Sequence, residues 1–228
     1  MCERAVPVLA LDGPSGSGKG TIARRAAAAL GWHLLDSGAL YRLVGLAADR
    51  KGMDLADEEA VAALASGLAV KFGADDEGNE RIWLDGEDVT ADVRTEETGR
   101  LASTVAALPA VRAALMDLQK SFRQAPGLVA DGRDMGTQVF PDAAAKVFLT
   151  ATPEERARRR YKQLKDKGIG VSLTALSRDI ADRDRRDSER AVAPLRPADD
   201  AYVLDSSNKT IEEVTQEVLD RVALLVSE

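Results

Sequence analysis

The sequence contains few of the features that mark secreted or membrane proteins. Cys2 is the only cysteine among 228 residues, so no internal disulfide can form. No apolar run approaches the roughly 20 residues that a membrane-spanning helix needs. The first residues also lack the apolar core of a secretory signal. We therefore expect a cytoplasmic location and no membrane partner.

The charge balance is acidic overall and basic in one region. The formal net charge is −7, which argues against a nucleic-acid polymer as partner. Between Arg156 and Arg190, however, 12 Lys/Arg face 6 Asp/Glu, a local balance of +6, so the remainder carries −13. Such a distribution suits a compact, highly charged ligand better than a long polyanion.

Short apolar segments alternate with helical patterns along most of the chain. The pattern predicts an α/β fold with a doubly wound, five-stranded parallel sheet flanked by helices. The expected parallel strands are 8–11, 32–35, 128–130, 146–149 and 202–204. The expected helices are 21–30, 39–50, 57–66, 95–107, 109–123, 153–167, 173–190 and 210–225.

A small antiparallel insert is expected at about 67–92. Residues 68–72 and 81–84 read as strands, and 73–79 as the polar turn between them. Asp85-Gly86 is typical of a tight hairpin turn that leads back toward Asp88.

The run after the first strand has the composition of a phosphate-binding loop (P-loop). Glycines free the backbone to aim several N–H groups at one anion, and the helix that follows adds its positive end. Lys19 can reach the terminal phosphates of a nucleotide. The alternative, a glycine-rich turn without a ligand, leaves the lysine and its spacing unexplained. The predicted phosphate-binding residues are Gly13, Pro14, Ser15, Gly16, Ser17, Gly18, Lys19, Gly20 and Thr21.

The loop ends in Gly20-Thr21, whereas the common pattern has Ser or Thr directly after the lysine. This ending resembles the version found in nucleoside monophosphate kinases. We expect Mg²⁺ to be bound mainly through ATP phosphates and water, near Thr21, with no direct protein ligands assigned.

Three further charged segments are candidates for a ligand site. They are 131–134, 154–160 and 183–190. The first follows the predicted strand 128–130, the second follows the predicted strand 146–149, and the third lies within the predicted helix 173–190. At helical spacing, Arg183, Arg186, Asp187 and Arg190 share one face. Solvated turns or ion-paired surface helices remain alternative readings for all three segments.

Many arginines beside a P-loop suit phosphoryl transfer between two phosphorylated molecules, where catalysis is mainly alignment and charge neutralisation. The guanine-binding Asn-Lys-x-Asp pattern is missing from the sequence. These features favour a nucleotide kinase. A kinase for UMP, AMP or a small alcohol stays open, as does a nucleotide-binding regulator without turnover.

Four segments in order, 11–21, 32–42, 130–137 and 190–195, resemble the bacterial cytidylate kinase family over nearly the whole chain. The resemblance implies a monophosphate-binding subdomain that carries the β insert and a short arginine-rich lid. The implied organisation is core 1–37, subdomain 38–125, core 126–153, lid 154–171 and core 172–228.

The resemblance also implies transfer of the γ-phosphoryl group of ATP to CMP or dCMP with Mg²⁺. Separately, we expect a monomer. Lys19, Arg133, Arg183 and Arg190 would be catalytic, and Arg156 and Arg160 of the lid would bind ATP. The implied CMP-binding residues are Ser37, Tyr41, Arg42, Ser103, Arg112, Arg133, Asp134, Arg183, Asp187 and Arg190.

Overall fold

The computed structural model describes residues 5–74, 80–166, 168 and 170–226. The chain divides into two compact units, one made of Met1–Asp36 with Gln119–Glu228 and the other of Ser37–Leu118. The organisation into core, monophosphate-binding subdomain and lid remains a prediction.

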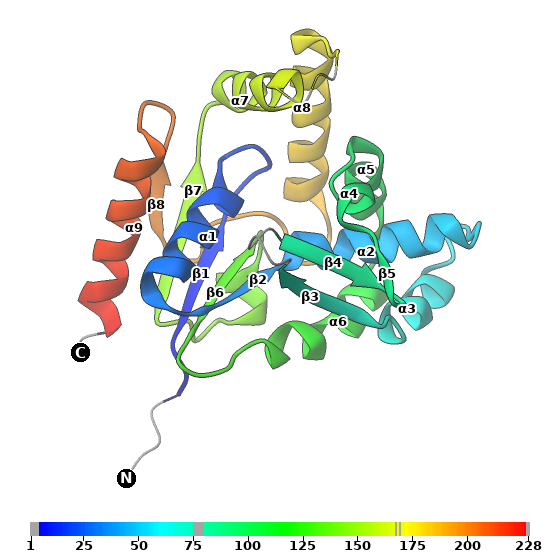
Figure 1. The fold of residues 1–228 in the computed structure, drawn as a ribbon, viewed down its shortest axis with the longest axis horizontal. Coiled ribbons are helices and arrows are strands. Elements are labelled where there is room, and N and C mark those ends of the chain that lie inside the picture. The colour runs from blue at the N-terminus through cyan, green and yellow to red at the C-terminus, as the bar shows by residue number, and fades with distance from the viewer. Residues whose placement is uncertain (1–4, 75–79, 167, 169, 227–228) are drawn as a thin grey trace. The chain divides into compact units, whose positions relative to one another are not determined.

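The first unit is built on a five-stranded parallel sheet (Figure 1), which confirms the predicted α/β fold. Its strands are short and largely apolar, as expected for strands covered on both faces. In sheet order they are β2 (His33–Asp36), β6 (Leu128–Gly132), β1 (Val8–Asp12), β7 (Ala145–Thr150) and β8 (Tyr202–Asp205).

The strand register aligns the chemistry-bearing ends of the central strands. Asp12, the last residue of β1, pairs with Gly132 at the end of β6, and Asp36 of β2 pairs with Asp131. The loops that leave these strands therefore start at one edge, where ligands of such sheets bind.

Helices α1 and α9 cover one face of this sheet. Apolar residues at helical spacing on α1, such as Ile22 and Ala26, meet Val214 and Val218 of α9 over Leu9 of β1. The helices of this unit are α1 (Lys19–Leu30), α7 (Pro153–Asp166), α8 (Leu173–Glu189) and α9 (Ile211–Val226), with a short π-helical turn, η1 (Met135–Val139).

The second unit packs helices against a three-stranded antiparallel sheet, which confirms the predicted insert. Ile82, Leu84 and Phe72 of the sheet join Leu43 of α2 in one apolar cluster. The elements are α2 (Ser37–Arg50), α3 (Glu58–Ser66), β3 (Val70–Ala74), β4 (Glu80–Leu84), β5 (Glu87–Asp88), α4 (Thr90–Val93), α5 (Glu96–Val105) and α6 (Pro109–Ser121).

The insert's hairpin turn has the expected geometry. Asp85 and Gly86 both have positive φ, 52° and 88°, as a two-residue turn of the favoured hairpin type requires. The predicted turn at 73–79 falls mostly outside the described residues, as does Lys167 at the predicted end of α7. Helix α4 and turn η1 were not predicted, because four or five residues are too few to show the periodicity of apolar residues that marks a helix.

Within the described part of the chain, no single helix is long and apolar enough to cross a membrane. Helices α5 and α6 reach that length and composition only together, and they are bent by 103° at the break between them.

Gly13 shows why the loop after β1 needs glycine. Its φ is 147°, and a Cβ at this position would lie 2.0 Å from the carbonyl oxygen of Leu149 in β7. The P-loop therefore leaves β1 in contact with the neighbouring strand, and no side chain fits between them.

We predict that Gly13→Ala destabilises the protein by roughly 3 kcal/mol or more, because crowding against Leu149 adds to backbone strain. Gly31→Ala is the matched control, since Gly31 has a φ of 66° with nothing within 4 Å of its Cβ position. It should cost only about 1 kcal/mol. Urea unfolding measures both, and equal costs would refute the role assigned to the contact with β7.

Candidate active site

The loop between β1 and α1 forms a preorganised turn around its lysine. Gly16 and Gly18 have φ of 78° and 95°, and Gly18 caps α1 with its backbone alone. The Lys19 side chain is 6% exposed, and its Nζ donates to the carbonyl oxygen of Pro14 at 2.9 Å. Ser17 Oγ is buried with no hydrogen-bond partner. The loop is thus shaped like an anion nest with a cation beside it.

The charge of Lys19 is destabilised in the free protein. Burial and the nearby positive charge of Arg133 lower its pKa to about 8, while Asp131 and Asp12 act in the opposite direction. A phosphate chain in the loop would supply negative charge and favour the protonated lysine.

Two carboxylates next to this lysine also have shifted pKa values. Burial raises the pKa of Asp12 to about 7, although the amides of Gly136 and Met135 donate to it. Burial likewise raises the pKa of Asp131 to about 6, and the charge of Lys19 limits that rise. Such a cluster of perturbed groups at a sheet edge is typical of a functional site.

The structure brings Arg133 and Asp187 together beside this cluster. Arg133 Nε donates to Asp187 Oδ2 at 2.5 Å, joining the loop after β6 to α8. Burial raises the pKa of Asp187, but the charges of Arg133, Arg183 and Arg190 outweigh that effect and lower it. Asp187 therefore stays ionised and orients Arg133.

Asp134 and Arg190 form a second, looser pair in the same region. Arg190 Nη2 lies 3.8 Å from Asp134 Oδ1, and Arg190 Nε donates to the carbonyl oxygen of Ala193 at 2.5 Å. Arg190 lies one residue beyond the end of α8. Arg183, Arg186 and Asp187 all lie on α8 at the predicted spacing, but Arg186 is exposed whereas Asp187 is buried.

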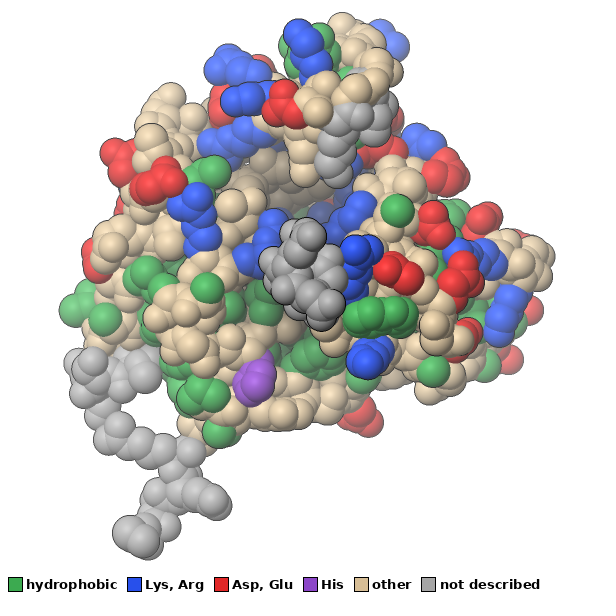
Figure 2. Space-filling model, in the orientation of Figure 1, with side chains coloured by type: hydrophobic (Ala, Val, Ile, Leu, Met, Phe, Trp, Pro, Cys, Tyr) green, Lys and Arg blue, Asp and Glu red, His purple; other side chains and the backbone are tan. Residues whose placement is uncertain are grey.

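Helices α7 and α8 carry many Lys and Arg side chains on the face shown in Figure 2. Arg156, expected to bind ATP, is 3% exposed and donates to the carbonyl oxygens of Ala151 and Ser15 and to both carboxylate oxygens of Asp184. Arg160 donates to Gln163 at 2.5 Å. ATP binding by these two residues remains a prediction.

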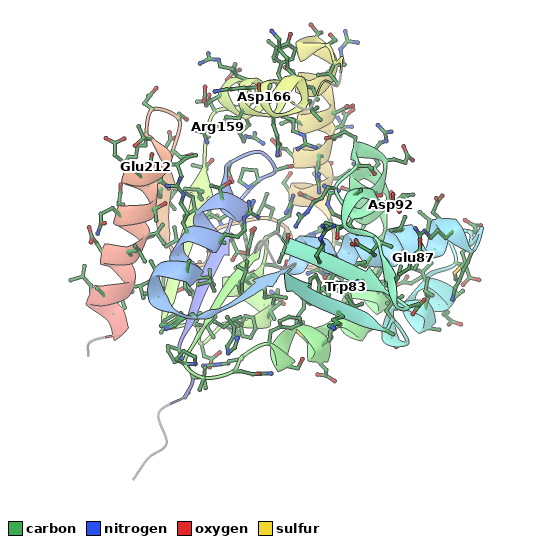
Figure 3. The ribbon with its side chains drawn as sticks, viewed as in Figure 1. Trp83, Glu87, Asp92, Arg159, Asp166 and Glu212 are labelled. Carbon is green, nitrogen blue, oxygen red and sulfur yellow. The ribbon has the colours of Figure 1, made fainter. Side chains whose placement is uncertain are left out.

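Arg159 is a candidate site residue that sequence reasoning missed. It extends from α7 toward the P-loop and the end of β8 (Figure 3). It donates to the carbonyl oxygen of Ser17 at 3.1 Å and to both oxygens of Ser206. Its place in an arginine run gave no signal that distinguished it from Arg156 or Arg160.

The second unit holds the other predicted CMP-binding residues. Arg112 is buried, with its guanidinium 5.6 Å from the ring centroid of Tyr41. Ser103 Oγ is buried without a hydrogen-bond partner, and Ser37 is also buried. Arg42 donates to the carbonyl oxygens of Val93 and Thr95. Their contacts with CMP remain predictions.

Among the described residues, no group of three or more His, Cys, Asp or Glu side chains could hold a metal ion. Oxygen donors of the kind Mg²⁺ prefers are nevertheless present beside the loop. An Asp131 carboxylate oxygen lies 3.4 Å from the Cβ position of Gly20, next to Thr21. These donors fit an ion that arrives with a nucleotide.

A P-loop at the carboxyl edge of a parallel sheet, with Arg133 and Arg183 near its lysine, defines a P-loop phosphotransferase. Its family follows from comparison with known proteins. The family model described as cytidylate kinase matches residues 9–224. The chain belongs to the cytidylate kinase family.

Cytidylate kinases from other bacteria match this chain over almost its full length. The cytidylate kinase of Pseudomonas paraeruginosa (strain DSM 24068 / PA7) is 62% identical over 216 residues, covering 94% of each chain. That of Stutzerimonas stutzeri (strain A1501) is 60% identical and covers 96% of each. That of Methylococcus capsulatus (strain ATCC 33009 / NCIMB 11132 / Bath) is 58% identical and covers 96% of this chain and 98% of the relative.

The pKa of Lys19 predicts how ATP affinity depends on pH. A lysine is charged below its pKa and neutral above it, so ATP binding should weaken as pH rises through about 8. We expect the Kd for ATP to increase severalfold between pH 7.5 and 9.5, measured by calorimetry. Lys19→Arg keeps its charge over this range and should show a constant Kd. A pH-independent Kd in the wild type would contradict the assignment.

Proposed function

We propose that this protein transfers the γ-phosphoryl group of ATP to CMP or dCMP, giving ADP and CDP or dCDP. The observation that carries the proposal is the hydrogen bond between Arg133 and Asp187, which joins the loop after β6 to α8. The charges of Arg133 and Arg183 also both lower the pKa of the P-loop lysine. A nucleotide-binding regulator needs the lysine alone. A kinase with a phosphorylated acceptor needs cations for a second phosphate.

The P-loop residues would bind the phosphates of ATP, with Lys19 at the β- and γ-phosphates. The bond between the γ-phosphorus and its bridging oxygen to the β-phosphate breaks as a phosphate oxygen of CMP bonds to the γ-phosphorus. Negative charge spreads over the transferred group during this step. Arg133, Arg183 and Arg190 would neutralise that charge. Asp187 already orients Arg133 through a hydrogen bond, and Asp134 lies 3.8 Å from Arg190.

The remaining predicted site residues would recognise the base and the sugar. A cytosine edge offers an amino donor and two acceptors, which a carboxylate, an arginine and a hydroxyl can match. Asp134, Arg112 and Ser103 have those groups. Ser37, Tyr41 and Arg42 would contact the acceptor nucleotide, and Asp187 its sugar hydroxyls.

Mg²⁺ would be held by ATP phosphates, water, the Asp131 carboxylate and the hydroxyl of Thr21. When bound, it would supply positive charge that offsets the negative charge of the ATP phosphates. Arg156 and Arg160 would belong to a lid over ATP. We place the protein in the cytoplasm and expect a monomer with no nucleic-acid or membrane partner.

A coupled ADP-release assay with CMP, dCMP, UMP, AMP and GMP tests the function. We expect ADP release with CMP or dCMP at a kcat/KM at least tenfold above that of the other acceptors. Release of ADP with neither would refute the proposal, and a preference for AMP would assign a different monophosphate kinase.

Substitution of the acceptor-site arginines tests the mechanism. Arg183→Ala should lower kcat/KM for CMP by about 10³, the lower end of what one transition-state arginine contributes. Arg186→Ala on the exposed side of the same helix is the control and should retain activity within twofold. Circular dichroism checks that both remain folded. Near-normal turnover of Arg183→Ala would place this arginine outside the reaction.

A further inference from the structure

Asp12 is not among the residues assigned to ATP, CMP or Mg²⁺, yet it directly precedes the P-loop and contacts the loop after β6. It is the last residue of β1, immediately before Gly13, and its side chain is 5% exposed. Burying a carboxylate is costly unless donors satisfy it. The donors of Asp12 therefore indicate what it does.

Those donors are two successive backbone amides of the neighbouring loop. The N–H of Met135 donates to Asp12 Oδ1 at 2.8 Å, and the N–H of Gly136 donates to Oδ2 at 2.8 Å. These residues open turn η1. Asp12 thus performs, from another strand, the capping that an N-cap side chain normally performs for its own helix.

This arrangement releases Asp134 from capping. Asp134 is the N-cap residue of η1, and its side chain makes no cap hydrogen bond. Its carboxylate is directed instead to the neighbourhood of Arg190, 3.8 Å away.

The loop is also fixed on both sides of Arg133 and Asp134. On one side, Gly132 is held in the sheet by its register with Asp12. On the other side, Met135 and Gly136 are held by the Asp12 carboxylate. Asp12 therefore adjoins the loop on both sides of Arg133 and Asp134, the segment that the proposed function directs at the acceptor.

We infer that Asp12 is a positioning residue for the acceptor nucleotide: by holding the amides of Met135 and Gly136 it orients Arg133 and Asp134 for CMP. This inference rests on the proposed function. Although Asp12 directly precedes the P-loop, it should therefore influence binding of the acceptor more than binding of ATP.

The test substitution is Asp12→Asn, which keeps the shape of the side chain but presents an NH₂ group to one of the two amides. We expect the KM and the calorimetric Kd for CMP to rise at least tenfold, while the KM for ATP changes less than threefold. Asp57→Asn is the matched control, because Asp57 caps α3 in the ordinary way through the N–H of Ala60. It should leave both KM values within twofold.

A merely structural role would reduce the amount of folded enzyme without changing KM in the folded fraction. A CMP KM within threefold of wild type, or an equal rise in both KM values, would overturn the inference.

Hydrogen exchange of the wild-type protein gives a readout that does not need the variant to fold. The amides of Met135 and Gly136 should be protected, and in Asp12→Asn that protection should be lost over 133–139 alone. Rapid exchange of these amides in the wild type would refute the geometry. If the wild type releases no ADP with CMP or dCMP, the proposed function fails, and the exchange result still decides whether Asp12 holds the loop.

Discussion

The buried charge of Lys19 is the constraint on which the arrangement of the first unit depends. Its side chain is enclosed by its own loop and lies near Arg133 and Arg183, so neighbouring carboxylates must compensate its charge. Asp131 and Asp12 provide that compensation only in part, since burial raises their own pKa values. The free protein thus holds positive charge that a phosphate chain would neutralise.

The carboxylates that offset the positive charge also fix the orientation of an arginine side chain. Arg133 could adopt many rotamers in water, but its bond to Asp187 ties it to α8. Removing either partner would leave a buried charge without its counterpart, which costs more than the pair itself contributes. The acidic residues of the site therefore hold its cations in position as well as offset their charge.

Features of the fold that depend on local sequence patterns could be predicted. Apolar runs predicted the parallel strands, and Asp85-Gly86 predicted the hairpin because few other residues tolerate its φ values. Long-range pairings were not predictable in this way. Asp12 lies 123 residues from Met135, whose amide it accepts, and Asp184 lies 28 residues from Arg156, which donates to it. No helical or strand period encodes such contacts, which depend on register between strands and on helix packing.

The arginines of α7 explain how the P-loop keeps its amides directed at a ligand. In a trans peptide the carbonyl and the following N–H point in opposite directions. Arg156 binds the carbonyl oxygen of Ser15, and Arg159 binds that of Ser17. The amides of Gly16 and Gly18 must therefore face away from α7, on the side where a phosphate would lie. Glycine permits this backbone, and the two arginines stabilise it, so that the nest exists before the nucleotide binds.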